Sequence, residues 1–329
     1  MSRHHAVPSS PRRLVGVVAL LSVAVGCSGV DASEPTQRTT ATLAPITVPP
    51  TVVLDEPRAI LVQGSLVRPI FENFNEATFS NPTGIDNQWF PLTPGNRLVL
   101  SGSSVKGDEV LAHRLEYVIT DLTKEILGVE TVVVWIEDYS DDELVEAELA
   151  FYAQDDRGNV WFFGEHPEEY EDGEFVASPT WIAGVDNARP GIMMYAQPEP
   201  GRPPYFQGWG PGVEWSDFGS VESVVAEVCV ALGCYSNVLM IAESSLGEAG
   251  IVQLKSYARG VGTIHVDFRG EDATQEKLEV VRVEALSDVA MARYRALSIA
   301  LEANAYNISP AIYGSTAPLR VAGHSRPRP

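Results

Sequence analysis

The chain has 329 residues, of which 45% are hydrophobic, and it carries 44 acidic against 23 basic residues, for a formal net charge of −21. A surface this acidic repels nucleic acid and anionic headgroups, so we exclude nucleic acid as a partner. The length suffices for one large domain or two small ones with a buried core.

Residues 1–27 have the features of an export signal. Arg12 and Arg13 end a basic segment, and residues 14–26 form an apolar run that is too short to span a membrane as a helix. The run ends in Ala24-Val25-Gly26-Cys27, which resembles the bacterial lipobox, where a cysteine is lipid-modified after cleavage. We therefore expect lipidation at Cys27 and a lipid-anchored protein on the outer face of a bacterial cell membrane. An ordinary secretory signal, which leaves the protein secreted, is the alternative.

The domain organisation follows from composition. Residues 28–58 are rich in Ser, Thr, Pro and Ala, and we expect them to form a disordered tether. Residues 59–312 are predicted to form a single β-rich domain, and residues 313–329 a disordered tail.

The stretch 79–102 is predicted to be a turn-filled entrance to the domain, with Trp89 and Phe90 inserted into the core. After it, apolar and polar residues alternate, as is typical of strands. The predicted strands lie at 111–119, 131–136, 145–153, 160–163, 213–230, 235–243, 251–258, 262–268 and 277–285. The fold class is therefore mainly β (α+β), an antiparallel curved sheet or open barrel.

Two further segments complete the predicted domain. Residues 179–212 are rich in Gly and Pro and carry several aromatic residues, so we expect them to cover one end of the sheet or to line a cleft. Residues 287–306 have the apolar spacing of an α-helix that Ser287 can cap, and we expect this helix to pack on the sheet.

Cys229 and Cys234 lie between two predicted strands, at the neck of a four-residue loop. In an oxidising compartment we expect a disulfide that pins this hairpin. A metal pair is the weaker alternative, because no further cysteine and no nearby histidine supplies the remaining ligands.

Three motifs resemble the signatures of a family of exported bacterial β-rich proteins of unknown function, often lipoproteins. These are Trp89–Asn96 with a "WFPL-x-PG" pattern, Gly158–Glu165, and Tyr257–Gly262 with a "YA-x-GVG" pattern. The resemblance covers about residues 70–285. It implies an exported, β-rich protein and assigns no catalytic residue.

Gly84-Ile85-Asp86-Asn87 recurs as Gly184-Val185-Asp186-Asn187, and each copy lies near a tryptophan. Two matched loops can converge on a ligand, with the aspartates as an acid–base or cation-holding pair. The alternative is that the pattern is ordinary turn chemistry. The candidate binding residues are Asp86, Trp89, Trp181, Asp186, Tyr205 and Trp209.

Residues 137–148 hold seven acids and residues 165–174 hold six. Neither cluster has the spacing of a calcium loop, so we predict no metal site and interpret both clusters as a solvated edge that discourages sheet-to-sheet aggregation. His166 is predicted to lie in a charged loop, and His113 on an apolar strand face.

The chain contains no recognised hydrolase, metalloprotease or phosphate-binding motif, so we assign no catalytic residue and no cofactor. We expect a cell-envelope protein that binds an apolar small molecule, a lipid or a protein partner, and that meets the membrane through its anchor alone. The alternatives are a secreted hydrolase that uses Asp86, Asp186 or His265, and a purely structural envelope protein.

Overall fold

The computed structural model describes residues 60–62, 65–248 and 250–322, with side chains from Arg68 onward. Cys27, the predicted signal and the predicted tether lie outside the described residues. A short hairpin of β1 (Ile60–Val62) and β2 (Ser65–Val67) comes first, followed by the 3-10 turn η1 (Phe74–Glu76).

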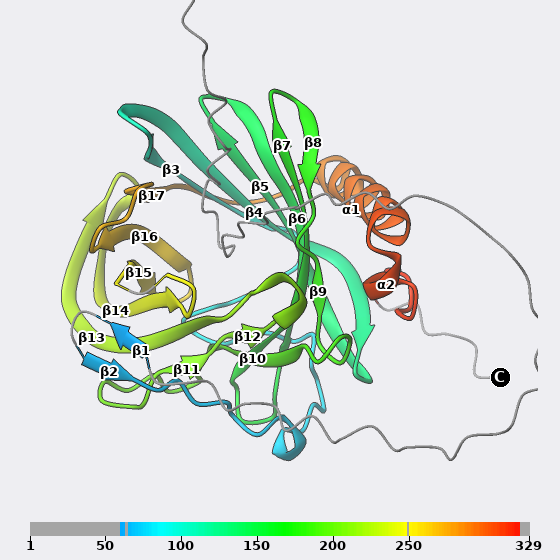
Figure 1. Cartoon of the computed structure of the whole chain (residues 1–329), viewed down its shortest axis with the longest axis horizontal. Helices are drawn as coiled ribbons and strands as arrows, with labels where there is room; N and C mark the ends of the chain where they lie inside the picture. The colour runs from blue at the N-terminus through cyan, green and yellow to red at the C-terminus, as the bar shows by residue number, and fades with distance from the viewer. Residues whose placement is uncertain (1–59, 63–64, 249, 323–329) are drawn as a thin grey trace, which may run out of the picture.

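The first half of the main sheet is an antiparallel meander (Figure 1). Its strands are β3 (Asn96–Lys106), β4 (Glu109–Ile126), β5 (Val129–Ser140), β6 (Glu143–Gln154), β7 (Val160–Glu171) and β10 (Arg189–Met194), with β8 (Glu174–Ala177) and β9 (Trp181–Ile182) also paired to β7. Leu127-Gly128, Asp141-Asp142 and Asp172-Gly173 make tight turns in which both residues have positive φ, as two-residue hairpins prefer.

The second half of the sheet is another meander. It consists of β13 (Asp217–Val230), β14 (Gly233–Ser245), β15 (Val252–Ala258), β16 (Gly262–Arg269) and β17 (Lys277–Ala285). β17 pairs with β3, which joins the two meanders into one continuous sheet.

The two outer edges of this sheet meet in five consecutive residues. β11 (Tyr205–Phe206) pairs with β13, and β12 (Gly208–Trp209) pairs with β10, with Gln207 between them. The 3-10 turn η2 (Pro211–Val213) follows. Because one short segment is paired on both sides, the sheet forms a nearly closed antiparallel barrel, which confirms the predicted fold class. The aromatic segment 179–212 thus supplies strands of the barrel and does not simply cover its end.

The C-terminal helix α1 (Asp288–Ile308) packs on the outer side of the barrel against β4 and β6 (Figure 1). The Ser287 side chain caps it by accepting a hydrogen bond from the Ala290 N–H at 3.3 Å. The short helix α2 (Pro310–Tyr313) and strand β18 (Arg320–Val321), which pairs with β4, follow.

The described part of the predicted tail, residues 313–322, is ordered. The Lys124 ammonium lies 2.7 Å from Glu302 of α1 and donates to the Ala317 carbonyl at 2.7 Å. Glu302 also accepts a hydrogen bond from the Leu319 N–H at 2.8 Å. A buried ion pair therefore fixes this segment against β4, which its Pro- and Gly-containing composition does not indicate.

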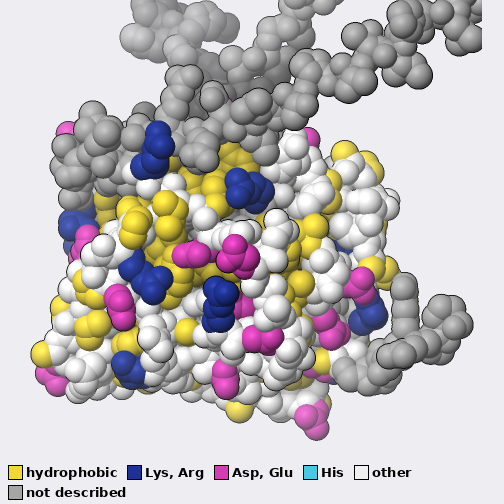
Figure 2. All heavy atoms as spheres, turned by 90° about the horizontal axis from the view of Figure 1, so that it is seen from below, with side chains coloured by type: hydrophobic (Ala, Val, Ile, Leu, Met, Phe, Trp, Pro, Cys, Tyr) yellow, Lys and Arg dark blue, Asp and Glu magenta, His cyan; other side chains and the backbone are white. Residues whose placement is uncertain are grey.

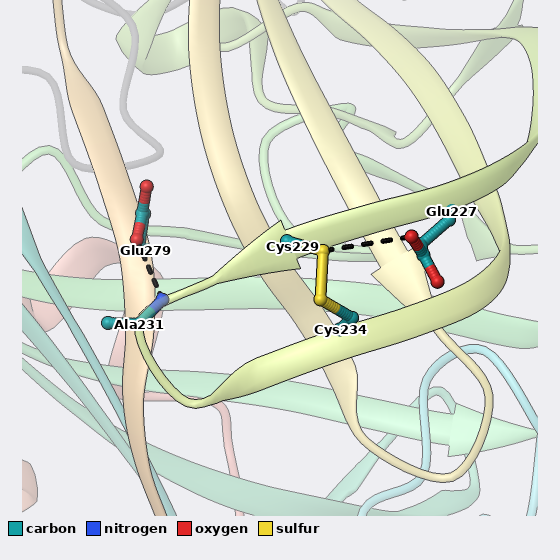
Figure 3. The surroundings of a disulfide bond; sticks show 5 residues. All are labelled: Glu227, Cys229, Ala231, Cys234 and Glu279. Carbon is teal, nitrogen blue, oxygen red and sulfur yellow. Dashed lines mark hydrogen bonds between the residues drawn. A yellow bond between two sulfur atoms is a disulfide. The ribbon is translucent and has the colours of Figure 1, made fainter.

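The tip of the β13–β14 hairpin carries a disulfide between Cys229 and Cys234 (Figure 3). The two residues are paired across the strands with Cα atoms 4.0 Å apart, and Val230 and Gly233 form one further pair. The loop is thus two residues long, shorter than predicted. The Ala231 N–H donates to Glu279 at 2.9 Å, which ties the tip to β17.

The described surface is mixed in character. On the face seen from below, acidic and basic side chains are interspersed with hydrophobic ones, so the net negative charge is not gathered there (Figure 2). None of the described helices is both long enough and apolar enough to cross a membrane.

Candidate functional site

Two of the sequence motifs meet at one end of the barrel interior. The Gly260 N–H donates to the Gln88 carbonyl at 2.7 Å, and the Arg259 guanidinium lies 4.2 Å from the centre of the Trp89 ring. Trp89 is 2% exposed, as expected of a core residue. The turn at 88–92 and the turn at 259–263 are therefore held against each other, although 170 positions separate them in the chain.

A cavity of about 60 Å³ lies behind these two turns. The turns contribute Phe90, Pro91, Leu92, Val261, Gly262 and Thr263, and the barrel strands contribute mainly apolar and aromatic side chains, among them Ile119, Val134, Ile136, Tyr152 and Tyr257. A buried water needs about 10–15 Å³, so the cavity has room for about four to six water-sized groups. Its lining and size match an apolar group of a few heavy atoms, which is smaller than a whole lipid.

One charged side chain, Lys255 of β15, belongs to the cavity wall. Its ammonium lies 2.5 Å from Glu243, which also accepts hydrogen bonds from Gln207 at 2.8 Å and from the Tyr257 hydroxyl at 3.3 Å. The positive charge of Lys255 is thus balanced inside the barrel, and the wall remains suitable for an uncharged group.

Further along the same strands the interior becomes acidic. On β5, Val134 and Ile136 line the cavity, and Asp138 follows on the same face. On β6, Glu146 and Glu148 share the face of Tyr152, and the pairs Asp138–Glu146 and Ile136–Glu148 lie directly opposite each other. We call this interior the lumen; its acidic part comprises Asp138, Glu146, Glu148, Glu165, Glu243 and Glu276, each at most 7% exposed.

The interpretation of the acidic clusters as a solvated edge is therefore wrong for six of their thirteen acids, which are buried: Glu137, Asp138, Glu146, Glu148, Glu165 and Glu168. Asp141, Asp142 and Glu143 are exposed, but Asp138, Glu146 and Glu148 are buried, as is Glu165 of the second cluster. The physical reason is that β6 is covered on both sides: Ala147, Leu149 and Phe151 belong to the hydrophobic core, and the intervening glutamates face the lumen.

Burial is the main cause of raised pKa values in this cluster. It raises the pKa of Glu148 to about 8 and that of Glu276 to about 7, and it raises the pKa values of Glu146 and Glu165. His113 lies between Asp138, at 2.7 Å, and Glu276, at 3.2 Å. Burial alone lowers the pKa of His113, but the hydrogen bond and charge of Asp138 outweigh it, so the net shift is upward.

The predicted binding residues lie in several separate parts of the structure. Asp86 is exposed and accepts a hydrogen bond from Gln154 at 2.6 Å. Trp181 and Asp186 both line a separate groove of about 190 Å³ beside α2. Tyr205 is fully buried at the β11–β13 pair, and Trp209 is partly buried on β12. Of the candidates, only Trp181 and Asp186 thus share a described groove, and Trp89 lies next to the cavity.

Sequence reasoning missed a hydroxyl–imidazole network at this second groove. His166 is fully buried on β7, not in a charged loop, and its Nδ1 lies 2.7 Å from the Thr180 hydroxyl. Thr180 in turn accepts a hydrogen bond from Ser309, at the junction of α1 and α2, at 3.2 Å. Glu168 lies 3.7 Å from Nε2 of His166, beyond hydrogen-bond distance. We therefore assign the network a structural role in holding the helices on the barrel.

His265, the remaining residue of the hydrolase hypothesis, lies on β16, away from Asp86 and Asp186. It is paired with Ser256 of β15 and with Glu279 of β17. Among the described residues, the group with metal-ligand distances is Glu227, Cys229 and Cys234, whose sulfurs are occupied by the disulfide.

Comparison with known proteins gives fold-level likeness alone. The sequence matches no protein family and no curated protein. Two solved structures are similar: an inferred exported protein with a YmcC-like fold from Bacteroides fragilis, at 13% identity and a TM-score of 0.36, and an inferred lipoprotein from Parabacteroides distasonis, at 12% identity and a TM-score of 0.36. Each covers 60% of this chain and 99% of its own.

Proposed function

We propose that the protein is an exported, lipid-anchored protein of the bacterial cell envelope that binds an apolar ligand in the cavity behind residues 88–92 and 259–263. The observation that carries the proposal is that two distant sequence motifs line one apolar cavity inside the barrel. Ligand sites in proteins are concave and mostly apolar, with a few polar groups that fix orientation. The export and anchoring part rests on the segment that ends at Cys27.

The volume limits what enters. A complete small-molecule site usually measures about 300–1,000 Å³, so 60 Å³ accepts only the end of a larger ligand. Phe90, which is partly buried and packs on Tyr152 with ring centres 5.4 Å apart, is the aromatic side chain of the 88–92 turn that faces this space. Binding of a larger apolar group therefore requires Phe90 to move.

Native mass spectrometry of the protein purified from its own host tests the proposal. We expect a bound apolar molecule, recovered by extraction, that is lost in a Val134→Phe variant because the ring fills the cavity. A Val281→Phe variant is the matched control, since Val281 is 39% exposed on β17 and lies outside the cavity lining. A bare-chain mass for the wild-type protein, or equal loading of both variants, contradicts the proposal.

A further inference from the structure

The lumen has two chemically different parts along the same strands. On β4, Ile119 and Tyr117 line the cavity, and His113 follows on the same face among the acids. Residues two apart on a strand are separated by about 7 Å, so Ile136 at the cavity and Asp138 in the acidic part are neighbours along one wall. The apolar cavity lining and the acidic side chains therefore lie next to each other along the same wall of the lumen.

The acidic part holds more buried carboxyl groups than it has basic neighbours to pair with them. Among the described residues, the buried basic groups that pair with its acids are His113 and Lys255. The buried Glu116, in contrast, is paired with Arg97 and Arg114, outside this cluster. Among the described residues, six lumen carboxyls thus face two cationic partners.

Glu165 gives an independent indication that this part of the lumen accepts a ligand. Its side chain is fully buried, and neither carboxylate oxygen has a hydrogen-bond partner within the described structure. Glu165 lies directly opposite Ala150 of β6, on the face that carries Glu146 and Glu148, so it belongs to the acidic cluster. The indole N–H of Trp181, opposite Glu165 on β9, is a neighbouring donor that opposes the rise in the pKa of Glu165, but it lies outside hydrogen-bond geometry with either carboxylate oxygen. A buried carboxyl without a partner is costly unless a donor reaches it.

Resting on the proposed function, we infer that the ligand is a cationic amphiphile: an apolar chain whose end occupies the cavity and whose protonated amine lies among Glu148, Glu165 and Asp138. An ammonium group has only donors, which is what carboxylate oxygens without partners require. Tyr117 and Tyr152, which line the cavity, share their strand faces with His113 and with Glu148, respectively. A fatty acid has the opposite charge, which adds to the acidic groups of the lumen and balances none of them.

Three probes of eight carbon atoms each separate the contributions of the apolar chain and the head group: octylammonium, octanol and octanoate, each titrated calorimetrically into the full chain. We expect octylammonium to bind most tightly and octanoate most weakly. Glu148→Gln or Glu165→Gln should weaken octylammonium binding by about tenfold or more, because each removes one charge-assisted hydrogen bond, and should leave octanol binding within about twofold. Glu143→Gln, at an exposed acid on the same strand as Glu148, is the matched control and should change neither.

The outcomes distinguish the inference from the proposed function. Binding of octanol or octanoate as tight as that of octylammonium, or an unchanged octylammonium affinity in both lumen variants, overturns the amine head while leaving an apolar site intact. Failure of all three probes to bind also overturns the inference, and the native mass measurement then decides the proposed function separately. Because Gln keeps the size of Glu, urea denaturation of each variant verifies that a lost affinity is not a lost fold.

Discussion

The buried carboxyls predict that this protein becomes less stable as pH rises from 5 to 8. Glu276 has a pKa of about 7 in the folded protein against 4.5 without its surroundings, mainly because of burial. The folded state therefore binds a proton that the unfolded state has already lost, so stability is fully present below about pH 4.5 and declines until the pH passes 7. His113 acts in the same direction, because its raised pKa favours the folded state at lower pH.

The size of the stability change follows from the rise in the pKa of Glu276. A pKa raised from 4.5 to about 7 corresponds to roughly 3–4 kcal/mol from Glu276, at about 1.4 kcal/mol per pH unit. A Glu276→Gln variant should therefore lose less stability than the wild type between pH 5 and 7.5, by about 1 kcal/mol per pH unit at the steepest point. The effect is specific to the lumen, so Glu143→Gln at an exposed position should leave the slope unchanged.

Urea unfolding at half-unit pH steps, followed by circular dichroism, measures both slopes. A wild-type stability that is constant or rises between pH 5 and 8 would refute the reasoning, as would equal slopes for the wild type and Glu276→Gln. Either result would mean that water reaches these carboxyls and that the lumen is not a low-dielectric interior.

Two further predictions concern the barrel and its helix. Gly191→Ala should destabilise the protein by several kcal/mol in the same urea assay, because a Cβ there would lie 2.4 Å from the Phe206 carbonyl oxygen at the closing segment. Gly247→Ala is the control and should be close to neutral, because the nearest atom to its Cβ is 4.0 Å away. Lys124→Met should lower the free energy of unfolding by about 3–5 kcal/mol, because it leaves Glu302 buried without its cation. The double variant Lys124→Met with Glu302→Leu should recover most of that loss. A Lys124→Met variant as stable as the wild type in urea would contradict the importance of the pair.

The sequence predicts the strands well because period-two alternation records which residues face a covered side. It predicts the 287–306 helix because Ser287 and the apolar spacing mark its start and its buried face. It does not predict closure of the barrel, since β11 and β12 are two residues each and carry no periodic signal. Such short strands are defined by their partners and not by their own composition.

The acidic lumen was missed for a different physical reason. In residues 145–153 the alternation of apolar residues with Glu146 and Glu148 is what a strand with one solvated face also shows. The sequence contains no feature that distinguishes water from a closed interior on the acidic side. A partial signal was available in residues 134–140, where the face of Val134 and Ile136 continues into Asp138 and Ser140, because a face that is apolar at one end is not a plain solvent edge.

The division of the barrel into two meanders also sets the order in which it can form. Each of the pairs within residues 96–194 and within residues 217–285 joins strands that are neighbours or near neighbours in the chain, and the closing segment 205–209 pairs with strands close to it in sequence. Among the pairs along the barrel itself, β3–β17 joins the most distant residues, near 100 and near 280, while β18 lies off this path and pairs with β4. Loop-closure entropy opposes the β3–β17 contact most strongly among the barrel pairs, so its docking is the expected rate-limiting step of barrel closure.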